Sequence, residues 1–166
     1  MRYRVNVRQE NSRMCFVCGH KNAFGLHASF YELENNQLLA VFNPKDEHQG
    51  YPGRLHGGMA ATILDETMGR AIRMHEDLWG VTAEITIRYR KPVPLDREIR
   101  ATGRIVRETE RSFEAAGEIL LEDGSVAVEG FGKYIKLPID KIADFDEDEQ
   151  EWRVTPSPDD PQEVEL

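Results

Sequence analysis

One stretch, residues 55–69, constrains the fold of this chain more than any other. It opens with His56, Gly57 and Gly58 and continues as a run of small and branched apolar residues. A carboxylate, Asp65, stands nine positions after the histidine. Apolar residues that recur at steps of three and four are typical of one helix face, so the stretch predicts a loop leading into a helix that spans about residues 57–75.

The two adjacent acids of this stretch fall on different faces of the predicted helix. At 100° per residue, Glu66 lies beside Arg70 in the favourable i, i+4 order, and we expect that face to be solvated. Asp65 lies at the edge of the opposite face, which should pack on a sheet and is formed by Ala60, Ala61, Leu64, Met68, Ala71 and Ile72. Glu66 therefore has an ordinary surface explanation, whereas Asp65 has none.

Alternating apolar and polar residues predict strands on both sides of the helix. The expected strands are 27–33, 37–43, 81–90, 98–107, 112–121 and 125–137. Asn35-Asn36 and Asp123-Gly124 are typical of tight hairpin turns. The pattern indicates an α+β fold in which one long central helix covers one face of a curved antiparallel sheet. The edge strands of such a sheet have unpaired backbone groups, and many proteins satisfy these groups by pairing with a second copy.

The composition predicts three parts: an N-terminal arm with a Cys-x-x-Cys turn (1–25), a domain (26–137) and an acidic tail (138–166). Residues 1–14 are expected to form an arm or short helix, and the tail a peripheral helix or extended segment followed by disorder. Cys15 and Cys18 invite a zinc interpretation, but structural zinc takes four ligands, and only His20 and His27 lie nearby. We therefore expect a compact turn with two half-buried thiols and no metal.

Bulk properties exclude several classes of partner. The formal net charge of -9 argues against nucleic acid, whose phosphates require a basic face. The sequence has no apolar run of the roughly 20 residues that a membrane helix needs. Its first residues do not resemble the apolar core of a signal peptide. We expect a cytoplasmic protein with free thiols and no membrane partner.

The start of the predicted helix offers a site for chemistry. The first backbone N–H groups of a helix have no partner within it, and glycine allows a ligand to approach them closely. Such groups can polarise a carbonyl, while a nearby carboxylate serves as general base or nucleophile. Gly57 and Asp65 would together suit acyl transfer to water. Equally, the glycines could serve packing alone, with Asp65 in an ordinary hydrogen bond.

The chain resembles the hotdog-fold acyl-CoA thioesterases of the phenylacetate-pathway (PaaI-like) family. The resemblance rests on Leu55-His56-Gly57-Gly58 with Asp65 nine residues after the histidine, on the strand residues 80–89, and on Lys91-Pro92-Val93-Pro94. It covers residues 26–137 and implies a hotdog fold, in which two subunits form one continuous sheet with active sites at their interface. It also implies an acyl-CoA substrate and a homodimer or dimer of dimers.

The resemblance also implies roles for individual residues. Asp65 matches the catalytic carboxylate, and the Gly57 backbone N–H matches the group that polarises the thioester carbonyl. His56 matches a histidine that supports the loop, and Thr82 matches a hydroxyl that orients the attacking water. Further candidates are Gln49 for a polar loop role, with His48 as its competitor, and Gly58, Arg88 and Arg90 for substrate binding. Asp65 and Gly57 of one site would come from different subunits.

We therefore expect an enzyme that hydrolyses an acyl-CoA thioester without a metal or an organic cofactor. The alternative is a non-catalytic acyl-CoA-binding or regulatory protein on the same fold, because a fold does not determine a function. A hotdog dehydratase fits less well, since dehydratases resemble a different spacing of histidine and acid.

Overall fold

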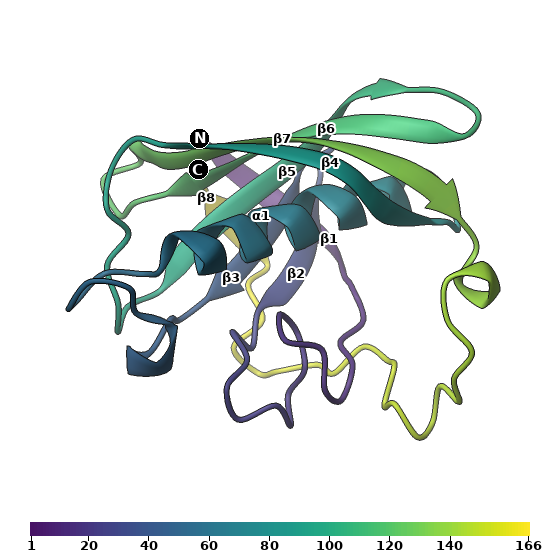
Figure 1. Cartoon of the computed structure of the whole chain (residues 1–166), viewed down its shortest axis with the longest axis horizontal. Helices are drawn as coiled ribbons and strands as arrows, with labels where there is room; N and C mark the ends of the chain where they lie inside the picture. The colour runs from purple at the N-terminus through teal and green to yellow at the C-terminus, as the bar shows by residue number, and fades with distance from the viewer.

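The computed structural model describes all 166 residues and places one long helix against a single antiparallel sheet (Figure 1). Eight strands form this sheet in the order β4-β7-β6-β5-β3-β2-β1-β8. No helix is long and apolar enough to cross a membrane. The strands are β1 (Arg2–Arg8), β2 (Ser29–Leu33), β3 (Leu38–Phe42), β4 (Trp79–Tyr89), β5 (Ile99–Glu108), β6 (Ser112–Leu120), β7 (Val126–Leu137) and β8 (Glu163–Glu165).

The helix α1 (Gly57–Arg70) continues as one short 3-10 turn, η2 (Ala71–Met74), which together match the predicted helix. Two further 3-10 turns, η1 (Asp46–His48) and η3 (Ile139–Lys141), lie in loops. The expected strands all form, and Asn36 adopts the positive φ of 59° that its hairpin turn requires. The predicted α+β class is therefore confirmed.

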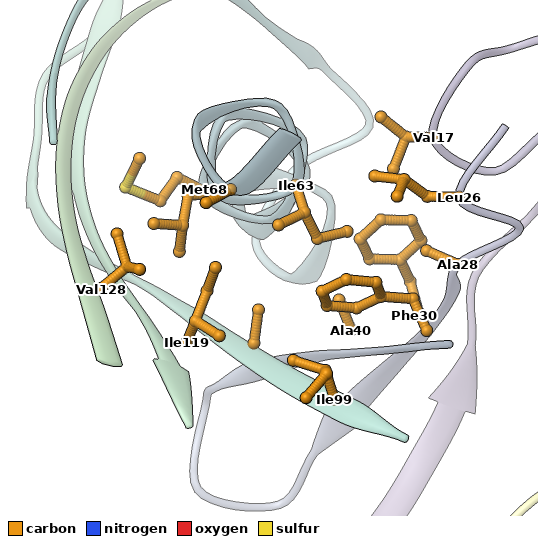
Figure 2. Packing of buried hydrophobic residues seen from close by; sticks show 14 of the residues in the cluster. Val17, Leu26, Ala28, Phe30, Ala40, Ile63, Met68, Ile99, Ile119 and Val128 are labelled. Atoms are coloured by element: carbon orange, nitrogen blue, oxygen red, sulfur yellow. The ribbon is translucent and has the colours of Figure 1, made fainter. Parts of the chain in front are cut away.

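The core lies between α1 and the concave face of the sheet (Figure 2). Ile63 and Met68 project from the helix toward sheet residues such as Phe30 and Ile119, and all four have at most 1% of their surface exposed. Val17 and Leu26 of the N-terminal segment close one side of the same cluster. Burial of side chains of this size supplies roughly 1.5–3 kcal/mol each, which fixes the helix on the sheet.

Glycines in the sheet allow the helix to lie close to it. A Cβ atom on Gly103 of β5 would lie 2.8 Å from the backbone oxygen of Thr67 in α1. A Cβ atom on Gly117 of β6 would lie 2.9 Å from Cγ of Met68. Because the first of these neighbours is backbone, it cannot yield by rotation of a side chain. The separation of helix and sheet is thus set by the missing side chain at position 103.

Both ends of the chain differ from the prediction. Residues 2–8, expected as an arm or short helix, form the strand β1, which pairs with β2. Glu163–Glu165, expected to be disordered, form β8 and pair with β1. Tyr3, Val5 and Val7 alternate with polar residues, which is a strand pattern that the expectation of an arm did not use. The strand β8 has only three residues and forms because the edge of β1 offers unpaired backbone groups. The proposed domain boundaries at residues 26 and 137 remain predictions.

The helix face that carries Glu66 and Arg70 is largely covered rather than solvated, with Glu66 partly exposed and Arg70 buried. The predicted ion pair forms at 2.7 Å, yet only 3% of the Arg70 side chain is exposed. Its guanidinium lies over the Phe30 ring, 4.5 Å from the centroid, and donates to the Glu10 carbonyl at 3.0 Å. The expectation was wrong because a helical projection shows the helix alone, and the N-terminal segment covers this face in the fold.

We expect Gly103→Ala to destabilise the protein by about 1–3 kcal/mol, because the added methyl group collides with the backbone of α1. Urea unfolding monitored by circular dichroism measures this loss as a lower midpoint at an unchanged slope. The matched control is Arg104→Ala at the next, exposed position of β5, which should stay within about 0.5 kcal/mol of the wild type. Equal stability of the two variants would contradict the close approach.

Candidate active site

Asp65 lies half-buried between α1 and the sheet, and two hydroxyl groups hold its carboxylate. Thr82 Oγ1 of β4 donates to Asp65 Oδ1 at 2.9 Å. Tyr134 Oη of β7 donates to the same oxygen at 3.2 Å. Burial raises the pKa of Asp65, while these two hydrogen bonds oppose that shift. The other oxygen, Oδ2, accepts no hydrogen bond within the chain and is free to interact with a bound molecule.

An irregularity in β4 places Thr82 on the helix side of the sheet. Thr82 and Tyr89 are seven residues apart, so strict alternation would point them to opposite faces. Both nevertheless contact α1, because Tyr89 Oη donates to the Gly57 carbonyl at 2.7 Å and Thr82 donates to Asp65. The pairing of β4 with β7 shifts register between Thr82 and Glu84, which leaves Ala83 as an extra residue. This bulge therefore positions the Thr82 hydroxyl.

Tyr134 is a site residue that the sequence analysis missed. Its ring is fully buried and stacks on Phe113 with centroids 4.9 Å apart. Burial raises the pKa of the Tyr134 phenol, with the Asp65 carboxylate as the next contribution, so the hydroxyl stays protonated and donates. In the sequence, Tyr134 looks like one more apolar position of an alternating strand. The available signal was Gly69, because a glycine inside a helix can mark a place where another group lies close. A Cβ atom at Gly69 would lie 3.2 Å from Cε1 of Tyr134.

The start of α1 provides an unpaired backbone donor. His56 is the N-cap of α1, and its Nδ1 accepts a hydrogen bond from the Gly58 N–H at 2.9 Å. His56 therefore supports the turn, and this bond occupies the N–H of Gly58. The Gly57 N–H, by contrast, donates to no acceptor within the chain. Gly57 is thus the glycine whose N–H is available to a ligand at this helix terminus.

A cavity of about 660 Å³ opens in front of this helix start. Gly57 and His56 line it together with three cationic side chains: Arg54, Arg90 and Lys91. Of these, Arg90 is already paired with Glu129 at 2.8 Å. The cavity therefore combines a free backbone donor with local positive charge in a protein whose net charge is -9.

Three predicted polar side chains line neither this cavity nor the small pocket that Asp65 and Thr82 share. Gln49 is exposed and accepts a hydrogen bond from the Gly53 N–H at 3.3 Å. His48 is 4% exposed, and both of its ring nitrogens bond to backbone groups, those of Lys45 and Phe24. Arg88 is exposed on β4 and does not line the cavity. These residues were proposed from their positions in the sequence, but the local geometry of the loop and of β4 directs their side chains away from the cavity.

Asp65 and Gly57 of one chain cannot act on the same carbonyl group. They lie on one helix, eight residues apart, which corresponds to about 12 Å along its axis at 1.5 Å per residue. Two groups that act on one reacting carbonyl must each lie within about 3 Å of it. A single chain therefore carries two candidate half-sites, one at the start of α1 and the other past its middle.

One other group of side chains could hold an ion. Cys15, Cys18 and Glu66 have ligand atoms within 4.8 Å of one another. They lie on the side of α1 that faces the N-terminal segment, not the side that carries the Asp65 carboxylate. Both cysteines are free thiols, as the sequence analysis predicted, and Cys18 is buried.

The sequence and the fold of this chain are similar to those of known proteins. Residues 52–128, which include the start of α1, Asp65 and Thr82, match the family model "Thioesterase superfamily". This region of the chain is therefore similar to proteins of the thioesterase superfamily. A superfamily member with a crystal structure superposes with a TM-score of 0.69 and 30% identity, covering 74% of this chain and 60% of that one.

Two further proteins are similar to the chain, one in sequence and one in fold. Mouse (Mus musculus) acyl-coenzyme A thioesterase THEM4 is 28% identical over 116 residues, which are 69% of this chain and 50% of the relative. The chain thus spans about half the length of this curated relative. The PaaI protein of E. coli shares the fold, with a TM-score of 0.61 and 15% identity over 68% of this chain and 80% of that one. The hotdog fold is therefore confirmed.

We expect Tyr134→Phe and Thr82→Val each to raise the pKa of Asp65 further, because each removes a hydrogen bond that favours the charged carboxylate. Titration of the Asp65 carboxyl carbon by NMR measures the change. Thr86→Val, an exposed threonine on the same strand, should leave this pKa unchanged. A pKa of Asp65 that stays constant in both test variants would show that the hydroxyls do not bond to it.

Proposed function

We propose that this protein hydrolyses an acyl-CoA thioester to the free acid and coenzyme A. The observation that carries the proposal is Asp65: a half-buried carboxylate whose Oδ1 is held by Thr82 and Tyr134 and whose Oδ2 is free. The free oxygen can accept a proton from a bound water molecule, as a general base does. The superfamily match and the names of the curated acyl-CoA thioesterase relatives support the same activity.

In the proposed reaction, Asp65 Oδ2 takes a proton from a water molecule as the water oxygen attacks the thioester carbon. The backbone N–H of Gly57 donates to the carbonyl oxygen as negative charge develops on it, and the helix dipole adds to this effect. The carbon–sulfur bond then breaks, and the proton that Asp65 accepted passes to the thiolate of coenzyme A, which regenerates the carboxylate. Thr82 and Tyr134 hold the carboxylate in the orientation that aims Oδ2 at the water.

The two half-sites of one chain become complete sites in a homodimer. The strand β4 is an edge of the sheet, pairs with β7 alone and exposes residues 81–84 (Figure 1). A two-fold axis at the middle of β4 would pair this edge with its copy in antiparallel fashion. Thr82 and Asp65 of one subunit would then lie opposite Tyr89 and Gly57 of the other. The dimer therefore brings each carboxylate to a helix start from the second chain.

Positive charge at the cavity fits the coenzyme A part of the substrate. Arg54, Arg90 and Lys91 surround the opening beside Gly57, and phosphate groups bind favourably to such side chains. Arg54 is an addition to the residues predicted from sequence, while Arg90 was among them. The substrate would enter along this cationic rim with its thioester at the helix start.

Asp65→Asn should lower kcat at least about 100-fold, because the amide cannot accept the proton of the attacking water. Thiol release from a panel of short, long and aromatic acyl-CoAs measures the loss and also defines the acyl preference. The matched control is Asp77→Asn, an exposed acid just beyond η2 whose side chain is 96% exposed, and it should keep wild-type turnover. Normal turnover by Asp65→Asn would remove Asp65 from the mechanism. Tight binding without thiol release in the wild type would favour the non-catalytic alternative.

Gly57→Pro should lower kcat about 100-fold or more while the fold is retained, because it removes one N–H that stabilises the oxyanion. Proline is well tolerated at the first position of a helix, and the preceding His56 has φ -61° and ψ 137°, which suit a residue before proline. Gly57→Ala keeps the N–H and should retain most of the activity. Equal activity of the proline and alanine variants would contradict the role of this N–H.

Mixing Asp65→Asn with Gly57→Pro subunits tests the shared site. If each site combines Asp65 of one subunit with Gly57 of the other, every mixed dimer holds one intact site and one with both lesions. Random exchange makes half of the dimers mixed, so about a quarter of wild-type activity should return. Activity that stays at the level of the two parent variants would show that the sites do not cross the dimer.

A further inference from the structure

The Cys-x-x-Cys turn of the N-terminal segment is packed against α1, and the fold supplies a third possible ligand that sequence spacing could not reveal. The sulfur atoms of Cys15 and Cys18 and a carboxylate oxygen of Glu66 lie within 4.8 Å of one another. The two histidines that are near in sequence do not take part. His20 pairs with Glu151, and His27 bonds to the Asn22 carbonyl.

The backbone of the turn is built tightly around the first cysteine. The Gly19 N–H donates to the Cys15 carbonyl at 2.7 Å, and a Cβ atom at position 19 would lie only 2.3 Å from that oxygen. The Val17 N–H points at the Cys15 sulfur at 3.4 Å. Glycine at position 19 therefore permits a turn that presents both sulfur atoms to α1.

The charges around the cluster match a divalent cation. Metal-bound cysteines are thiolates, so Cys15, Cys18 and Glu66 would together carry three negative charges. The buried guanidinium of Arg70 supplies one positive charge, donating to Glu66 at 2.7 Å and to the Cys18 sulfur at 3.2 Å. Two negative charges remain in a region where unpaired charge is costly. One divalent ion neutralises them.

We propose that Cys15, Cys18 and Glu66 bind one zinc ion. Zinc accepts sulfur and carboxylate ligands in tetrahedral geometry, and thiolates favour it over magnesium or calcium. All three side chains line a cavity of about 210 Å³, which leaves room for a water molecule as the fourth ligand. On binding, the thiol protons are released to solvent.

The bound ion would fasten the N-terminal segment to the helix. The turn belongs to the N-terminal segment, and Glu66 belongs to α1. The C-terminal tail forms another wall of the same cavity through Trp152, whose ring packs on Trp79 with centroids 5.1 Å apart. The zinc site is separate from the proposed reaction, because the Asp65 carboxylate faces β4 and β7 instead.

Metal analysis of the untagged full-length protein tests the proposal. After removal of metal with a chelator, the reduced protein should bind about one equivalent of zinc by mass spectrometry of the metal content. Cobalt in place of zinc should show a thiolate-to-cobalt charge-transfer band. Zinc at a free concentration about 100 times its Kd should raise the Tm by roughly 5–10 °C. Failure to bind zinc, or an oxidised Cys15–Cys18 disulfide as the only resting form, would overturn the proposal.

Variants separate this site from the active site. Cys15→Ser/Cys18→Ser should abolish zinc binding, and Glu66→Gln should weaken it at least about 10-fold. His20→Ala and Asp65→Asn should both bind zinc as the wild type does. If the double cysteine variant does not fold, protection of both wild-type thiols from alkylation by zinc provides the same test. Zinc binding that survives loss of both cysteines, or thiols that zinc does not protect, would refute the proposed ligands.

Discussion

The packing of α1 onto the concave face of the sheet is the contact on which the rest of the structure depends. Helix residues Ile63, Leu64 and Met68 are fully buried there, and Gly103 removes the side chain that would hold the helix away from β5. The sheet covers one face of the helix and the N-terminal segment covers much of the other, so most helix side chains are held by packing. The site residues inherit their positions from this packing rather than from a flexible loop.

The same packing gives two adjacent acids on α1 opposite roles. Asp65 faces β4 and β7, where the Thr82 and Tyr134 hydroxyls hold one of its oxygens. Glu66 faces the N-terminal segment, where it pairs with the buried guanidinium of Arg70. A difference of about 100° around the helix thus separates the proposed reaction from the proposed zinc site.

Local patterns predicted the elements of this fold well, because alternation and helical spacing are properties of short segments. The helix start, the roles of Gly57 and His56 and the importance of Asp65 could be proposed from residues 55–69 and the resemblance that they carry. What could not be predicted depends on contacts between distant segments. Tyr134 reaches Asp65 from β7, and the three-residue β8 becomes a strand by pairing with β1. Arg70 is covered by residues of the N-terminal segment and β2, far earlier in the chain.

The bulge at Ala83 makes chain length, as well as residue identity, a determinant of this site. Substituting Ala83 would keep the extra residue, and with it the orientation of Thr82. Removing one residue there would restore regular pairing and turn the Thr82 hydroxyl to the outer face of the sheet, while Tyr89 would still reach the helix start. In an alignment of related chains, a one-residue gap in this strand would therefore indicate that the carboxylate has lost its Thr82 hydrogen bond. A single exchange of side chains elsewhere in the strand would not indicate this.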